Sequence, residues 1–203
     1  MDNLSTYIQY FKEAGPQSDF TWSASIFSEL IFLARNTPTL QPLGDLKPAR
    51  GKPLSFFLID ELASGHANPN IHLILPAINL LEINADKKNA LHYLLTLSPK
   101  AEEQIESATT ILMMSPQKLE LPNGLRQQAV LSPTMKLTVL EYAAFMKCQN
   151  NIYTFLEIVK KTYPQEIAAI LNDTNHEGKS LGDLLVARSV DVERLSACGW
   201  IKK

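Results

Sequence analysis

Cysteine is scarce in this chain. Its 203 residues include only two, Cys148 and Cys198, and these form no pattern typical of a disulfide framework or a zinc site. The four histidines also lack the spacing of metal ligands. We therefore expect neither a metal nor another cofactor, and we expect the protein in a reducing compartment such as the cytoplasm.

A hydrophobic run long enough to cross a membrane is also missing. The longest apolar segment, IHLILPAINLLEI, contains His72 and Asn79 and is well short of the ~20 residues that a transmembrane helix needs. At the N-terminus, MDNLSTYIQYFKEAG lacks the basic region and apolar core of a Sec-type signal. These absences predict a soluble protein without a membrane span.

An excess of charge of either sign is absent as well. The chain has 19 Lys and Arg against 21 Asp and Glu, a formal net charge of −2, and its basic residues are scattered. This distribution disfavours nucleic acid and anionic lipid as partners. With 45% hydrophobic residues, the chain can bury a substantial core and is short enough to form one compact domain.

What the sequence does contain is a recurring helix start. The segments NALHYLL, TVLEYAA and SLGDLLVA begin at Asn89, Thr138 and Ser180, each a capping residue followed three positions later by a polar residue. In the second of them, Thr138 and Glu141 are predicted to form a complete capping box. A fainter start, KPLSFFL, begins at Lys52, and the four starts are 37, 49 and 42 residues apart.

A second helical stretch follows each of the first three starts. NIHLILPAINLL begins at Asn70, PKAEEQIESATTILMM at Pro99 and NNIYTFLEIVKK at Asn150. Each unit is therefore predicted to be a pair of helices that packs on the next pair. The predicted fold class is all-α, built from stacked helical pairs.

These units resemble ankyrin repeats. In DKKNALHY, Asn89 and Ala90 stand at the threonine and proline of the D-G-x-T-P-L-H signature, and Leu91 and His92 match it. TVLEYAA matches the T-x-L-x-x-A-A core, and NHEGKSLGDLLVA is similar to a degenerate last repeat. The resemblance covers roughly residues 50 to 200. It implies a non-catalytic protein that binds other proteins. Effectors that intracellular bacteria inject into host cells include such proteins, so a translocated, host-directed adaptor is one version of this role.

The chain departs from the ankyrin pattern in several ways. All three intervals exceed the usual ~33 residues, so the units must carry insertions. Glu141 replaces the histidine of the signature, the full T-P-L-H never appears, and glycine is scarce, at 8 of 203 residues. An all-α stack of another kind therefore stays open.

The remaining segments suggest a cap, a connector and an insertion. Residues 4 to 13 and 21 to 35 are predicted helices that cap the stack, and the proline-rich NTPTLQPLGDLKPARGKP is predicted to be an extended connector. Residues 1–50 thus form the cap and connector, and residues 51–203 form the stack. In KLELPNGLRQQAVL, the run Pro122, Asn123 and Gly124 is a turn signal that predicts an inserted β-hairpin.

Two near-matches, one to a nucleotide site and one to a catalytic site, are weaker than their structural alternatives. EGKS, ending at Ser180, is similar to the end of a phosphate-binding loop, but Asp173 stands where that loop needs its first glycine. Cys148 with His92 or His176 could form a thiol and base pair, although nothing local supports it. We expect no catalytic residues. An enzyme with a cleft between the N-terminal helices and the stack, using Cys148 or Asp60, remains the alternative.

Function is therefore predicted on two surfaces of the stack. The concave face and the loop tips are where helical repeats bind proteins. The ankyrin frame places the concave face after the double alanine, and the hairpin tip can reach a partner without disturbing the core. The predicted partner-binding residues are Thr96, Phe145, Met146 and Lys147 on the concave face, and Asn123, Gly124 and Arg126 at the hairpin tip. The oligomeric state is left open.

Overall fold

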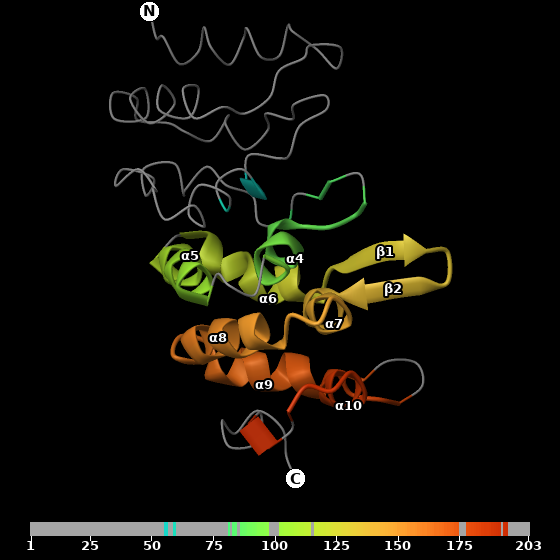
Figure 1. Ribbon diagram of the computed structural model, residues 1–203. Helices are drawn as coiled ribbons and strands as arrows, with labels where there is room; N and C mark the ends of the chain where they lie inside the picture. Colours follow the sequence, from blue (N-terminus) through green and yellow to red (C-terminus); the bar gives the residue numbers. More distant parts are fainter. Residues whose placement is uncertain are drawn as a thin grey trace, which may run out of the picture.

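Three short helices stack in order in the computed structural model (Figure 1). They are α4 (Ala90–Leu95), α7 (Val139–Phe145) and α10 (Leu181–Ala187), and α7 contacts both of the others. The structure describes residues 55, 56, 59, 81, 83, 84, 86–97, 102–114, 116–174, 178–191, 193 and 194. The predicted N-terminal cap, the connector and the helix from Asn70 lie outside these residues.

Each of the three helices begins with a capping box. The complete box predicted for Thr138 with Glu141 is confirmed, whereas the prediction for Asn89 and Ser180 was only a capping residue followed three positions later by a polar one. Asn89 accepts from the backbone N–H of Leu91 and of His92, both at 3.1 Å, and the Asn89 N–H donates to His92 Nδ1 at 3.2 Å. The boxes of Thr138 with Glu141 and of Ser180 with Asp183 have the same form. Each of the three capping residues also pairs with an earlier residue in an antiparallel bridge, Asn89 with Ile83, Thr138 with Gln128 and Ser180 with Thr174.

The helices α7 and α10 also end alike. Lys147 and Ser189, each nine residues after its capping residue, adopt the left-handed conformation with φ of 61° and 64°. In the first case the N–H of Cys148 donates to Ala143 O at 2.9 Å, and in the second the N–H of Val190 donates to Leu185 O at 3.0 Å. These bonds satisfy carbonyls that the helix end would otherwise leave unpaired.

A second layer of helices lies beside the first. It contains α5 (Glu102–Met114), α6 (Leu121–Arg126), α8 (Gln149–Lys160) and α9 (Pro164–Asn172), together with the short 3₁₀ helix η5 (Pro116–Glu120). Helix α5 packs on α8, and α6 packs on α9. The second helices predicted from Pro99 and Asn150 are confirmed as α5 and α8. Buried leucines, isoleucines and alanines from both layers form one core.

The hairpin exists, but its predicted position was wrong. Strands β1 (Gln128–Ser132) and β2 (Met135–Thr138) pair antiparallel, and their turn lies at Pro133 and Thr134. The run predicted to be the turn lies in α6. Its proline sits in the first turn of that helix, where its missing N–H costs nothing, and the apolar side chains of Leu121 and Leu125 point into the core.

The described part of the chain is therefore mostly helical, with seven α-helices and one two-stranded hairpin. Within it, no helix is long and apolar enough to cross a membrane. The hairpin projects from the same side of the stack as the bridge residues that precede α4 and α10 (Figure 1). Residues far apart in the sequence are thus brought to one side of the molecule.

Candidate functional site

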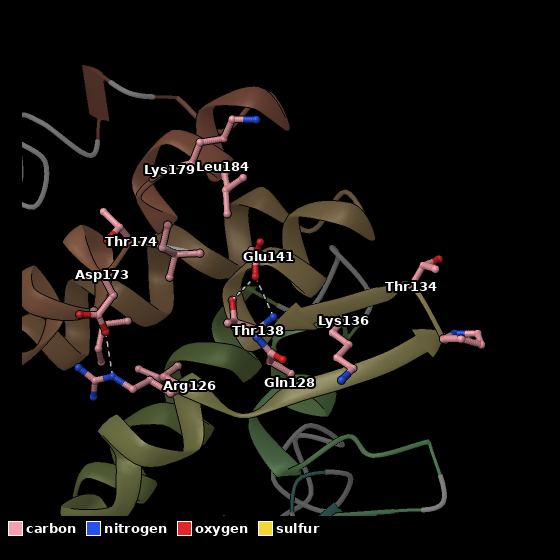
Figure 2. Close-up of a pocket in the computed structure, with 14 residues that line it drawn as sticks. Arg126, Gln128, Thr134, Lys136, Thr138, Glu141, Asp173, Thr174, Lys179 and Leu184 are labelled. Atoms are coloured by element: carbon pink, nitrogen blue, oxygen red, sulfur yellow. Dashed lines mark hydrogen bonds and ion pairs between the residues drawn. The ribbon is translucent and has the colours of Figure 1, made fainter. Parts of the chain in front are cut away.

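A pocket of about 450 Å³ lies between the hairpin and the start of α10. Its walls come from α6, both strands, the start of α7, the end of α9 and the start of α10 (Figure 2). Fourteen residues line it, namely Leu125, Arg126, Gln128, Pro133, Thr134, Lys136, Thr138, Glu141, Ile170, Asp173, Thr174, Lys179, Leu181 and Leu184.

The strand register decides which hairpin side chains face this pocket. Gln128 pairs with Thr138, and Val130 pairs with Lys136. Cross-strand partners and residues two positions apart share a face of a sheet, so these four lie on one face. Ala129 and Leu137 lie on the opposite face and are buried with Tyr142 of α7. This packing holds the hairpin against α7.

Both carboxylates in the pocket are already engaged (Figure 2). Glu141 Oε2 accepts from the backbone N–H of Thr138 at 2.9 Å and from its hydroxyl at 2.8 Å. Asp173 Oδ2 pairs with Arg126 Nε at 2.9 Å. Neither carboxylate is arranged as a general acid or base, because each accepts bonds from groups that hold α7 or α9 in place.

The pocket combines a cationic rim with an apolar interior. Arg126, Lys136 and Lys179 supply the positive charges, and the Lys136 ammonium makes no ion pair within the part of the chain that the structure describes. The buried side chains of Leu125, Ile170 and Leu181 supply the apolar surface, with Pro133 and Leu184. This combination can hold an apolar group that carries negative charge beside it.

Of the predicted hairpin-tip residues, only Arg126 lies in the pocket. Asn123 is exposed on α6 and donates to Glu120 Oε2 at 3.2 Å, and Gly124 is buried. A Cβ at Gly124 would lie 2.9 Å from Leu91 Cδ1, and the Gly124 carbonyl accepts from Asn89 Nδ2 at 2.7 Å. Gly124 thus holds α6 against α4. Neither Asn123 nor Gly124 is at a loop tip, because the tip is Pro133 and Thr134.

The predicted concave-face residues lie at the other end of α7. Phe145 and Met146 are 43% and 47% exposed, and Lys147 is exposed. The guanidinium of Arg188 lies 5.4 Å from the centre of the Phe145 ring. Thr96, after α4, is half-buried, and its hydroxyl donates to His92 O at 2.8 Å. Phe145 and Met146 thus form a second exposed apolar surface, away from the pocket at the start of α7.

The candidate thiol and imidazole lack the properties of a reactive pair. Burial raises the pKa of the Cys148 thiol, which disfavours the thiolate, and burial lowers the pKa of His92 to about 4. The Asn89 N–H donates to His92 Nδ1, which also lies 2.8 Å from Asn89 Oδ1, and Nε2 lies 3.5 Å from Leu137 O. Neither residue lines the pocket. His176 lies outside the described residues, which include no cluster of potential metal ligands.

Sequence reasoning missed the residues that the hairpin and the α9–α10 segment bring into the pocket. Lys136 sits in MKLT, where polar and apolar residues alternate, and Pro133 separates this run from QAVLS. That signal for a hairpin was present but was outweighed by the nearby Pro-Asn-Gly run. Lys179 and Asp173 occur in the near-match to a phosphate-binding loop, which does not indicate a pocket beside a hairpin.

Comparisons with known proteins add no family. No protein-family model, no curated protein and no solved structure matches the chain.

Proposed function

We propose that this protein is a non-catalytic module that binds another protein through the side of the stack that carries the hairpin. The pocket beside the hairpin is the observation that carries the proposal. It is concave and partly apolar, and both of its carboxylates are engaged in holding the fold. Such a site is suited to recognition, since a partner's side chain can enter without meeting an activated group.

The arrangement of the helices supports an ankyrin-like stack. Three helices begin with the same capping box, each capping residue pairs with a residue before it, and two of the helices end in the same left-handed residue. The first helices contact one another in order, as do the second helices α5 and α8. Stacks of this kind bind proteins on the side where their loops project.

Exposed apolar side chains on the hairpin support a protein partner. Val130, Leu131 and Met135 are exposed large hydrophobic residues within six positions of one another, in the β1–β2 segment. Leu131 lies at the irregularity where the register shifts between Val130 and Ser132. A bulge of this kind twists the strand and re-aims a side chain, which fits a contact surface.

The enzymatic alternative has less support. Its thiol is buried with a raised pKa and lies outside the pocket, and Asp60 lies outside the described residues. An activated cysteine needs a lowered pKa and access to solvent. The non-catalytic proposal needs neither property.

A comparative pull-down tests the proposal. The wild-type chain is compared with a hairpin variant that carries Val130→Thr, Leu131→Thr and Met135→Thr, which keeps residues suited to strands while removing apolar surface. Lysates of the source cell and of a candidate host are passed over each. The control is Leu119→Ser on η5, because Leu119 is 72% exposed and does not line the pocket.

We expect one protein to be retained by the wild type and by the control but not by the hairpin variant. Excess unlabelled wild-type chain should compete for it, and the circular-dichroism spectra of all three chains should agree. Equal retention by the hairpin variant, or no competed protein in any lysate, would contradict the proposed function.

A further inference from the structure

The charges of the pocket point to the chemistry of its partner, and this inference rests on the proposed function. We infer that the pocket receives an acidic segment of the partner protein, with one apolar side chain in the cavity and carboxylates at the rim beside Arg126, Lys136 and Lys179.

The charges at the rim of the pocket are only partly paired within the described residues. Glu141 accepts two bonds from Thr138, and Asp173 pairs with Arg126. Lys136 has no acidic partner within the described ranges, so its ammonium is the rim charge that a carboxylate of a partner can pair with. A carboxylate from a partner would find a cation there, whereas a lysine or arginine would meet like charge.

The guanidinium of Arg126 has hydrogen-bond donors that its bonds within the described residues do not use. Asp173 engages the Nε–H of Arg126, and Nη1 donates to Pro122 O at 3.5 Å. In the described part of the chain, Nη2 has no acceptor. The guanidinium is thus held in a fixed position by Asp173 with donors remaining, which favours a directed bond to a carboxylate oxygen.

The interior of the pocket is lined by apolar side chains. Leu125, Ile170 and Leu181 are nearly fully buried, and the cavity volume of about 450 Å³ falls in the range of ~300–1,000 Å³ typical of ligand sites. Pro133 is exposed and Leu184 is half-buried, so an acidic residue alone would leave their apolar surface in contact with water. A segment with an apolar residue flanked by Asp or Glu covers both the interior and the rim.

The experiment selects peptide ligands and does not require the natural partner to be known. A displayed library of random twelve-residue peptides is selected on the immobilised full chain, and enriched peptides are synthesised with a fluorescent label. Their affinities are measured by anisotropy for the wild type, for the Lys136→Glu and Lys179→Glu variants, and for Lys161→Glu. Lys161 follows α8, is exposed and does not line the pocket, so it controls for net charge.

The inference predicts enriched peptides with at least one Asp or Glu near an apolar residue. Their affinity should fall about tenfold or more with Lys136→Glu, fall similarly with Lys179→Glu, and stay within about twofold with Lys161→Glu. Replacing the peptide's acidic residue by lysine should restore binding to the reversed variants. Affinity should also weaken with added salt, since the rim is exposed.

Three results would overturn the inference. Enriched peptides could lack acidic residues, their affinities could be equal for all four chains, or no peptide could be enriched. These results are distinguishable from failure of the proposed function. If the hairpin variant still loses the partner in the pull-down while Lys136→Glu retains it, the interaction role stands and only the acidic chemistry is wrong.

Discussion

At the scale of the residue, Asn89 and His92 show how one capping box holds several elements together. Both side chains are fully buried. Besides capping α4, Asn89 Nδ2 donates to Gly124 O and to Gln127 Oε1, each at 2.7 Å, and so connects α4 to the end of α6. His92 replaces the Glu or Gln of the usual box and can do so only when neutral, because its Nδ1 must accept the Asn89 N–H.

This requirement predicts a pH dependence of stability. Burial is the main cause that lowers the pKa of His92 from 6.5 to about 4, and the nearby charge of Lys88 acts in the same direction. The unfolded chain therefore binds this proton more tightly than the folded chain. Stability should be fully present above about pH 6.5 and should fall by about 3 kcal/mol between pH 6.5 and 4 because of this group.

The His92→Gln variant isolates that contribution. Glutamine at this position can accept the same N–H but does not titrate. Urea unfolding of both chains at several pH values from 4 to 7 gives the comparison. We expect a shallower loss of stability in the variant, and identical pH profiles would show that His92 does not carry the effect.

At the scale of the element, α6 is a helix in a segment for which the sequence predicted a hairpin turn. The same letters, LPNGLR, contain a turn signal and a helix signal. The helix forms because Leu121 and Leu125, four residues apart, both reach the core, and because the absence of a Cβ at Gly124 leaves room for Leu91. These are tertiary contacts, so local turn propensity could not reveal them.

Two substitutions distinguish a helix from a turn here. Gly124→Ala should destabilise the protein by about 1–3 kcal/mol, because its Cβ would lie 2.9 Å from Leu91 Cδ1 in a packed core. Asn123→Ala should change the stability by less than about 0.5 kcal/mol or raise it slightly, because alanine suits an exposed helix position. Thermal or urea unfolding measures both. A costly Asn123→Ala combined with a harmless Gly124→Ala would favour the turn.

At the scale of the whole molecule, successive helical pairs are joined by polar contacts as well as by apolar packing. Asn151 of α8 is fully buried, and its Nδ2 donates to Leu95 O at 3.0 Å and to Leu97 O at 2.9 Å, at the end of α4. The Arg126–Asp173 ion pair joins α6 to the end of α9. The hydroxyl of Tyr153 on α8 accepts from the N–H of Asp191, after α10.

Asn151→Ala should therefore weaken the stack. The substitution removes the donor of the buried Leu95 carbonyl and of the part-buried Leu97 carbonyl, which costs about 1–3 kcal/mol. Asn150→Ala is the matched control, because Asn150 is its exposed neighbour in the first turn of α8 and should change stability by less than about 0.5 kcal/mol. Equal effects of the two substitutions on the urea midpoint would contradict the role of Asn151.

Sequence reasoning could predict the parts of the molecule that are encoded locally. The capping boxes at Asn89, Thr138 and Ser180 depend on two residues three positions apart, and all three are present. The pocket depends on contacts between distant segments, such as Arg126 with Asp173, which are 47 positions apart. No short window of sequence contains such a pair, so the pocket could be identified only from the structure.

The hairpin side of the stack is proposed to bind another protein, and site-specific photo-crosslinking can test this binding. A photoreactive benzoylphenylalanine is placed at Leu131 on the hairpin, at Phe145 at the end of α7, or at Leu119 as the control. The chain is then irradiated in lysate and adducts are identified by mass spectrometry. We predict a partner adduct from Leu131, and none from Leu119 or from Phe145, which lies on a different exposed surface. Adducts of equal yield from Leu119, or none from Leu131, would contradict the claim.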